Sequence, residues 1–286
     1  MRVGTQVANL IVDREKCTRC GLCTHICWTH AMVKDPVGYP MLRQISPDDA
    51  WHSCWACQRC MAVCPMGALY ICNKDPKDSV PASAVPEPGA VEALLLNRRT
   101  CRDYAEENVP YTTIEHILRI VSAGPTAGCH QQLSFTVITD RKALMRFRDH
   151  LWDRALENAQ QGIYPSGFSE QDFLLAKKGM DHGKDVVCRN ASHLLLIHEP
   201  AAQEGHTVDT GMALAYAELL LNAYGYGTLI ASFCWAALKT MPDIREELGI
   251  PAEHYLQCPL LFGVPSVFFQ RGVQRFDCLR IHRIES

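Results

Sequence analysis

Eight cysteines in the first quarter of the chain form two runs with the same internal spacing. The first run is Cys17, Cys20, Cys23 and Cys27, and the second is Cys54, Cys57, Cys60 and Cys64. Each cysteine of the second run lies 37 positions after its counterpart, and the same offset relates Ala31 to Ala68. We therefore interpret the two runs as an internal duplication. Thiolates at these spacings are typical ligands of iron–sulfur clusters.

The spacing also predicts which thiols share a cluster. A tight loop can direct three thiolates of one run to one face of a [4Fe–4S] cube, and the fourth thiolate then comes from the other run. We expect one cluster to be bound by Cys17, Cys20, Cys23 and Cys64, and the other by Cys54, Cys57, Cys60 and Cys27. Zinc is the main competitor, but zinc sites favour CxxC pairs with a spacer between them. Disulfides are the other alternative, and cysteines this close in sequence are poor partners for one another.

The two runs resemble those of the two-cluster bacterial ferredoxins. One residue departs from that pattern, because Trp28 follows Cys27 where a proline usually follows the fourth cysteine. We expect its indole to shield that cluster from water.

Arginines supply the second set of residues that could do chemistry. Arg98-Arg99-Thr100-Cys101-Arg102-Asp103-Tyr104 begins the remainder of the chain, and Arg271 and Arg275 lie near its end. Guanidinium groups match phosphate oxygens bidentately, although an Arg-Arg pair taken alone is more often a solvated helix end. No GxGxxG follows an expected strand and no GxxxxGK[ST] occurs, so neither a Rossmann dinucleotide site nor a P-loop is predicted.

Four segments, in this order, resemble the nitroreductase family of FMN flavoproteins. They are the arginine segment ending at Tyr104, then Pro125-Thr126-Ala127-Gly128-Cys129-His130-Gln131, then Gly225-Tyr226-Gly227-Thr228, and finally Phe262-Gly263-Val264-Pro265 with Arg271 and Arg275. The resemblance covers about residues 91–276. Joined to the cysteine runs, the chain resembles the ferredoxin–nitroreductase fusions of anaerobes. The alternation of expected helices and strands gives an α+β or an α/β class. The resemblance implies the α+β class, in which a mixed sheet flanked by helices follows a small N-terminal ferredoxin-like domain.

The resemblance also implies the contacts of the cofactor. Residues expected to bind FMN are Arg98, Arg99, Thr100, Arg102, Cys129, Gln131, Ala231, Ser232, Arg271 and Arg275. Ala231 and Ser232 would lie beside the flavin N5, where the chemistry takes place. No side chain is assigned a catalytic role. His130 is a weak candidate for a proton donor, since a surface or structural histidine is the commoner case.

The function implied is that of an oxidoreductase that passes electrons through two [4Fe–4S] clusters to FMN. The acceptor would be a small conjugated molecule such as a nitroaromatic, a quinone or an enone. The electron donor would be either reduced ferredoxin or NAD(P)H. Family members are homodimers with each FMN between subunits, and the apolar helix expected at 209–224 would contribute to that interface. The alternative is an electron-transfer module that delivers electrons to a partner protein and has no substrate of its own.

These residues need elements to position them. A linker with four prolines, at 76–89, separates a domain at 1–75 from one at 90–286. Hydrophobic periodicity predicts helices at 91–98, 112–121, 142–158, 209–224 and 243–248. Strands are predicted at 7–13, 68–72, 134–139, 193–198, 228–232, 256–263 and 266–270. Residues 162–183 are polar and irregular, with a short helix around 172–178, where family members vary a substrate lid.

Composition limits the setting. The 286 residues carry a formal net charge of −3, so no nucleic-acid or anionic-membrane partner is predicted. The apolar stretch Leu214–Leu238 is long enough to cross a bilayer, but Gly225 and Gly227 interrupt it, which favours a buried helix followed by a buried strand. The first 16 residues do not resemble a signal peptide. Seven further cysteines without ligand spacing favour a reducing compartment, the cytoplasm of an anaerobe.

Overall fold

The structure is a computed structural model that describes residues 9–44 and 49–285. The chain divides into two compact units. The first comprises Met1–Val85 together with Thr126–Gln131, and the second comprises Pro86–Pro125 and Gln132–Ser286. The domain limits expected from the sequence, at 75/76 and 89/90, stay a prediction. The start of the strand expected at Val7 lies outside the described residues.

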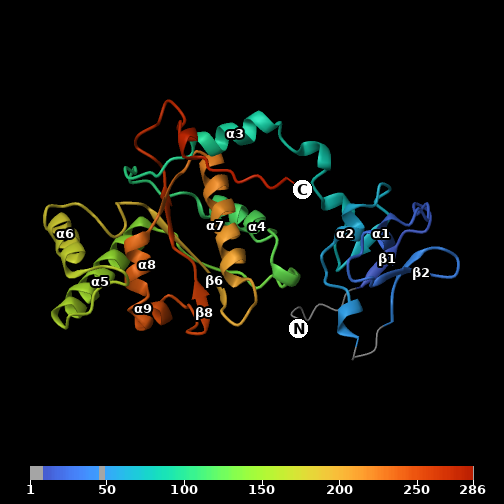
Figure 1. The fold of residues 1–286 in the computed structure, drawn as a ribbon, viewed down its shortest axis with the longest axis horizontal. Coiled ribbons are helices and arrows are strands. Elements are labelled where there is room, and N and C mark those ends of the chain that lie inside the picture. The colour runs from blue at the N-terminus through green and yellow to red at the C-terminus, as the bar shows by residue number, and fades with distance from the viewer. Residues whose placement is uncertain (1–8, 45–48, 286) are drawn as a thin grey trace. The chain divides into compact units, whose positions relative to one another are not determined.

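The first unit is built from short elements around the cysteines (Figure 1). Strand β1 (Leu10–Val12) pairs antiparallel with β4 (Leu69–Ile71), and β2 (Met32–Lys34) pairs antiparallel with β3 (Pro40–Leu42). Its helices are α1 (Leu22–His25) and α2 (Arg59–Ala62). The 3-10 turns are η1 (Ala50–His52), η2 (Pro76–Asp78) and η3 (Ala82–Ala84). Buried Cys23, Cys60, Leu69 and Ile71 share one hydrophobic cluster.

The duplication seen in the sequence extends to the backbone. Helices α1 and α2 begin 37 residues apart, each within a cysteine run. Left-handed residues recur at the same offset, as the pairs Arg19 and Ala56, Gly21 and Gln58, and His30 and Gly67. Left-handed backbone is uncommon for residues other than glycine. Its repetition at three matched positions therefore indicates that both runs fold into the same loop.

The second unit contains a five-stranded sheet with the order β5-β6-β9-β7, in which β8 also pairs with β6. Its strands are β5 (Ser134–Ile138), β6 (His193–Pro200), β7 (Gly227–Ile230), β8 (His254–Leu256) and β9 (Leu260–Gly263). Every ladder between these strands is antiparallel. We expected a mixed sheet. Among the described residues, the parallel pairing consists of one isolated bridge, between Thr100 and Thr228.

Helices cover both faces of this sheet (Figure 1). The helices of this unit are α3 (Pro88–Asn97), α4 (Tyr111–Val121), α5 (Arg141–Gln160), α6 (Glu170–Asp181), α7 (His206–Ala223), α8 (Ser232–Leu238) and α9 (Pro242–Glu247). Helix α3 buries no residue and belongs to neither core cluster. The remaining 3-10 turns of the chain are η4 (Ala127–Cys129) and η5 (Phe276–Cys278). Within the part of the chain that is described, no helix is long and apolar enough to cross a membrane.

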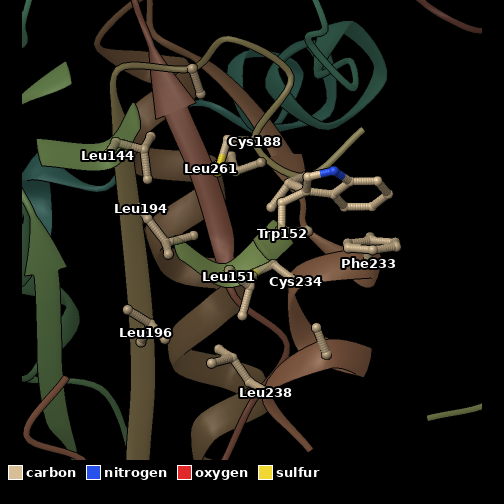
Figure 2. Close-up of a cluster of buried hydrophobic side chains, with 14 of the residues drawn as sticks. Leu144, Leu151, Trp152, Cys188, Leu194, Leu196, Phe233, Cys234, Leu238 and Leu261 are labelled. Carbon is tan, nitrogen blue, oxygen red and sulfur yellow. The ribbon is translucent and has the colours of Figure 1, made fainter. Parts of the chain in front are cut away.

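The core lies on the two sides of β6. Leu194 and Leu196 pack with α5 and α8, a cluster that Figure 2 shows around Leu151 and Trp152. Leu195 and Ile197 pack on the opposite face against α4 and α7. Side chains of a strand alternate between faces, so a strand of uninterrupted apolar residues is buried on both sides.

Most expected elements are present, with shifted ends. The stretch Leu214–Leu238 contains the end of α7 and then β7, as predicted, but its last part is helix α8, which we did not predict. The strand expected at 266–270 is wrong. Strand β9 ends at Gly263, and Ser266 donates its backbone N–H to Asp103 while Phe268 and Phe269 are exposed. Pro265 has no N–H to continue a ladder, which accounts for the end of the strand.

Candidate functional site

Two cavities of the first unit are each surrounded by four of the eight cysteines. One is lined by Cys17, Cys20, Cys23 and Cys64. The other is lined by Cys27, Cys54, Cys57 and Cys60. Each cavity thus receives three thiols from one run and one from the other, which is the grouping that the spacing predicts. Binding of metal by these thiols stays a prediction.

The donor set and its surroundings fit a cubane. Among the described residues, no three His, Cys, Asp or Glu side chains are grouped so that they could hold a single ion. In a cubane each thiolate binds its own iron, so its four ligands surround a volume instead. Backbone N–H groups of Met32 and Ala68 lie 3.4 Å from the sulfur atoms of Cys27 and Cys64. Such N–H···S contacts are one of the means by which proteins set cluster potentials.

Burial makes free thiolates costly in these cavities. Desolvation, together with the neighbouring Cys54, raises the pKa of Cys60 to about 12. Desolvation also raises the pKa of Cys23 and of Cys54. Thiolates bound to cationic iron are stabilised by the metal's charge. A bound cation would therefore stabilise the thiolates of these three cysteines, whereas the backbone N–H of Leu22 already lowers the pKa of Cys20.

Trp28 shields the cavity of Cys27 from water less than we expected. Its side chain lines the cavity of Cys27 but remains 62% exposed. It contacts Trp51 edge-on at 6.5 Å between ring centroids, and Trp51 contacts Trp55 at 5.8 Å. The indole therefore forms one edge of an aromatic group rather than a closed cover.

The second unit has a cavity of about 890 Å³. This volume falls within the range of small-molecule and cofactor sites. Five of the residues expected to bind FMN line it, namely Arg98, Thr100, Arg102, Ala231 and Ser232. The lining also includes Glu218, Arg189, Phe168, Asp172, Leu175 and Phe233.

The arginine segment is fixed at this cavity by its pairing with β7. Thr100 bridges Thr228, and the Cys101 N–H donates to the Thr228 carbonyl at 2.8 Å. Gly227 makes this approach possible, because a Cβ atom there would lie 2.6 Å from the Cys101 sulfur. Gly225 at φ 84 ends the turn from α7 in a left-handed conformation that glycine adopts readily. The two glycines of the Gly-Tyr-Gly-Thr segment thus bring Thr100 to the sheet.

Of the three arginines that line the cavity, only Arg98 forms an ion pair among the described residues. Arg98 donates to Glu218 of α7 at 2.9 Å in a half-buried ion pair. Thr228 also donates to Glu218, and Asn222 donates to Thr228 at 2.8 Å. Among the residues that the structure describes, Arg102 and Arg189 make no hydrogen bond or ion pair through their side chains. The cavity therefore presents two unneutralised guanidinium groups.

Within the segment at 162–183, the short helix expected around 172–178 is present as the longer α6, which borders one side of the cavity. Buried Phe173 stacks on Trp152 of α5 at 5.6 Å, and Trp152 lies 5.8 Å from Phe233. Phe168 meets Phe233 edge-on at 5.4 Å. Ser169 and Asp172 form a capping box that begins the helix. These contacts tie α6 to the core, while Leu175, which lines the cavity, is exposed.

Other residues expected at the cofactor do not line this cavity. They are Arg99, Cys129, Gln131, Arg271 and Arg275. Arg99 donates to the Arg271 carbonyl at 3.1 Å and lies over the Phe269 ring. Cys129, His130 and Gln131 belong to the segment grouped with the first unit. The Nδ1 atom of His130 is buried and has no hydrogen-bond partner among the described residues. The roles of these residues stay predictions.

Comparison with known proteins decides the family. The sequence pattern of the nitroreductase family matches residues 95–264, which is more than half of the chain. The chain belongs to the nitroreductase family. The pattern of a 4Fe–4S dicluster domain matches residues 16–69, which contain both cysteine runs. This nitroreductase-type oxidoreductase therefore carries an N-terminal iron–sulfur domain, as the sequence predicts.

The relatives of this nitroreductase are distant. A protein of Archaeoglobus fulgidus, provisionally named an NADH dehydrogenase/NAD(P)H nitroreductase, is 23% identical over 193 residues, which are 66% of this chain and 95% of the relative. A nitroreductase of Desulfitobacterium hafniense, solved with bound FMN, superposes with a TM-score of 0.54 at 15% identity, over 69% of this chain and all of that one. A nitroreductase of Bacteroides fragilis with bound FMN gives 0.52 at 16% identity, over 68% and 98% of the two chains. These structures share the fold of the second unit.

Sequence reasoning did not identify several cavity residues, among them Glu218, Arg189 and Phe168. Glu218 is one polar residue within an apolar helix, and Arg189 and Phe168 belong to no recognised motif. Glu218 offered one signal, because a charge within an apolar helix needs a partner. The sequence did not indicate that Arg98 is that partner.

Proposed function

We propose that this nitroreductase is an iron–sulfur flavoprotein oxidoreductase that passes electrons through two [4Fe–4S] clusters to FMN and on to a small conjugated acceptor. One observation carries the proposal. The same chain holds two cavities, each ringed by four thiols, and one cavity lined by Arg98, Thr100 and Arg102 on an FMN-type fold. The solved relatives with bound FMN support this choice of cofactor.

The residues of the cavity suggest how FMN would be held. Arg102 is an unpaired cation suited to the phosphate or the ring edge, and Thr100 would contact the ribityl chain or the phosphate. Arg98, already paired with Glu218, would position the cofactor without adding net charge. Of the two backbone donors expected near N5, the Ala231 N–H already donates to the Pro259 carbonyl. The Ser232 N–H has no acceptor among the described residues, so it is the donor we assign to N5.

Bound FMN would accept electrons one at a time from the clusters and release them in pairs to the acceptor. Reduction of a nitro group to a nitroso group consumes two electrons and two protons and releases water. Reduced ferredoxin or NAD(P)H would supply the electrons, and solvent the protons. The chain contributes two thiol-lined cavities for the one-electron carriers. It also contributes a cavity bordered by α6, in which a bound acceptor would displace water.

The cavity favours a small-molecule acceptor over the alternative electron-transfer module. Its volume of about 890 Å³ lies at the upper end of the range of ligand sites, and α6 supplies apolar side chains to it that could contact a second molecule beside the cofactor. An acceptor such as a nitroaromatic, a quinone or an enone would lie against Phe168 and Leu175. Reoxidation of the reduced protein only by an added protein partner would favour the module instead.

We further propose a homodimer in a reducing cytoplasm. Helix α7 buries Ala213, Ala217 and Leu221 in the core, while Val208 and Tyr216 on other sides are exposed. An apolar helix with exposed residues of this kind is suited to an interface with a second copy. All 15 cysteines are free thiols, which agrees with a reducing compartment.

Cofactor content and reduction kinetics test the proposal. Purified anaerobically, the protein is expected to contain about eight irons per chain, for two cubanes, and one FMN. Stopped-flow spectroscopy with NADH, NADPH and reduced ferredoxin would then identify the donor that reduces the flavin. Reoxidation by nitroaromatics, quinones and enones would identify the acceptor class. An iron content near two per chain, or a protein that binds no flavin, would refute the proposal.

A further inference from the structure

Arg189 is a cavity residue that the proposed cofactor contacts do not use. Its side chain is half-buried and lines the cavity that also contains Arg98 and Arg102. No hydrogen bond or ion pair of its guanidinium is found within residues 9–44 and 49–285. A guanidinium that lines a cavity without a protein partner is available to an anionic ligand.

The backbone beneath Arg189 is held in an unusual conformation. Arg189 and Asn190 are both left-handed, at φ 51 and φ 56, which side-chain-bearing residues rarely adopt. Asp185, whose side chain is 3% exposed, accepts backbone N–H groups of Val187 at 3.0 Å, Cys188 at 2.8 Å and Asn190 at 2.9 Å. One carboxylate thus fixes the whole loop. Backbone strain that is maintained in this way is typical of functional sites.

Further contacts lock the loop from both sides. Arg148 forms an ion pair with Asp185 at 3.8 Å, and Arg141 donates to the Asn190 carbonyl. Cys188, between Asp185 and Arg189, is completely buried. These contacts hold the backbone at Arg189 in place, so the loop itself needs little ordering when a ligand binds.

The loop belongs to the lid side of the cavity. The Lys184 N–H donates to the Gly179 carbonyl of α6 at 2.9 Å, and a Cβ atom on Gly179 would lie 3.1 Å from Val186. Arg102 lies instead on the segment paired with β7. The two unpaired cations therefore come from different elements. The one on the β7 side is placed for the cofactor, and the one on the lid side for the acceptor.

We propose that Arg189 binds an anionic group of the acceptor, so that the enzyme prefers conjugated acceptors that carry a carboxylate. The inference rests on the proposed FMN-dependent function and adds the substrate class. A planar guanidinium matches a carboxylate with two parallel hydrogen bonds. Phe168 and Leu175 would contact the apolar ring of such a molecule. Asp172, which also lines the cavity, accepts hydrogen bonds from Ser169 and is committed to the cap of α6.

A pair of acceptors of similar shape and different charge tests the inference, and the change of their ratio between variants cancels their different intrinsic reactivity. The substrates are 4-nitrobenzoate and 4-nitrobenzamide, and the proteins are the FMN-loaded wild type, Arg189→Gln and Arg189→Lys. Arg146→Gln serves as the control, because Arg146 is an exposed arginine on α5. The wild type is expected to prefer the carboxylate by about ten- to a hundredfold in kcat/KM, as a charged hydrogen-bonded pair allows. The preference should fall to about one in Arg189→Gln, fall partly in Arg189→Lys, and persist in the control.

Equilibrium dialysis with radiolabelled benzoate provides a readout that needs no turnover. Benzoate should bind the wild type at least about tenfold more tightly than Arg189→Gln, while the Kd for FMN stays the same. An equal loss for both substrates together with weaker FMN binding would assign Arg189 to the cofactor and overturn the inference. An unchanged benzoate affinity would overturn it as well. If no nitro compound is reduced but benzoate binding depends on Arg189, the proposed reaction fails and the anion site stands.

Discussion

Replacing Glu199 with glutamine should make the second unit more stable at neutral and alkaline pH. Glu199 lies in β6 with both carboxylate oxygens buried and without a hydrogen-bond partner among the described residues. Burial, and then the neighbouring Asp209, raise the pKa of Glu199 from 4.5 to about 7, while His206 opposes the shift. At about 1.4 kcal/mol per pH unit, the carboxyl removes at most about 3 kcal/mol of stability once it is ionised.

The direction of this effect follows from proton binding. Between pH 4.5 and about 7 the folded protein keeps the proton on Glu199, whereas the unfolded chain has lost it. Stability therefore falls as pH rises through this range and then stays constant. The buried histidines His193 and His198 act in the opposite sense, because burial lowers the pKa of each to about 4 and stability is lost as pH falls below 6.5. Their effect is common to the wild type and the variant, so it cancels in the difference.

Differential scanning calorimetry at a series of pH values from 4 to 9 would measure the effect. Glu199→Gln should match the wild type near pH 4.5 and exceed it increasingly up to about pH 7, by at most about 3 kcal/mol. Asp209→Asn should reduce the pH dependence of the wild type, because it removes one cause of the raised pKa. Glu253→Gln, at an exposed position, is the control and should leave the pH profile unchanged. Parallel profiles for the wild type and Glu199→Gln would refute the reasoning.

Three further predictions concern the cavities. Gly227→Ala should lower stability by about 1–3 kcal/mol and weaken FMN binding, because its Cβ would lie 2.6 Å from both Cβ and Sγ of Cys101. Cys101→Gly in the same background should recover part of both losses, and Gly89→Ala, where the added Cβ meets open space, should cause neither. Fluorescence titration of FMN measures the binding. Cys64→Ser should remove the cluster of the first cysteine run and about four irons per chain, while Cys278→Ser, at an exposed cysteine outside both cavities, should remove none, as iron analysis and EPR would show. Phe173→Ala should cost about 3–5 kcal/mol in denaturant unfolding, because the ring is buried and stacks on Trp152; Leu174→Ala, at an exposed neighbour, should cost little.

Local patterns predicted much of this fold. Cysteine spacing anticipated which thiols meet, because both runs form short loops whose geometry depends on few residues. Apolar periodicity anticipated α4, α5 and α7, and the continuous apolar run at 193–198 anticipated a strand buried on both faces. These features depend on neighbours in the sequence. They can therefore be recognised without knowing how distant segments pack.

Features that depend on distant segments were not predictable. Helix α8 was missed because Ser232–Leu238 is a short, uniformly buried apolar segment, and periodicity does not distinguish helix from strand there. The strand expected at 266–270 failed because Pro265 and the bond from Ser266 to Asp103 take that backbone away from the sheet. Arg189 was missed because its importance comes from Asp185, which has no recognisable motif. The short helix expected around 172–178 is present as α6, but the packing of its Phe173 on Trp152 of α5 could not be predicted from the sequence.

Arg98 and Arg102 of the arginine segment differ in whether an acidic side chain neutralises them, and a count of charges in the sequence does not show this difference. From the sequence, Arg98 and Arg102 are equivalent cations available to one phosphate. In the structure, Glu218 neutralises Arg98 and also accepts from Thr228, so this pair holds the segment against α7 and β7. Among the described residues of the lining, Arg102 and Arg189, which come from different elements, are then the cations without an ion pair, while Asp172 adds one negative charge. Arg102, on the segment that pairs with β7, is the cation we propose for the cofactor, and Arg189, on the loop beside α6, is the one we propose for the anionic group of the acceptor.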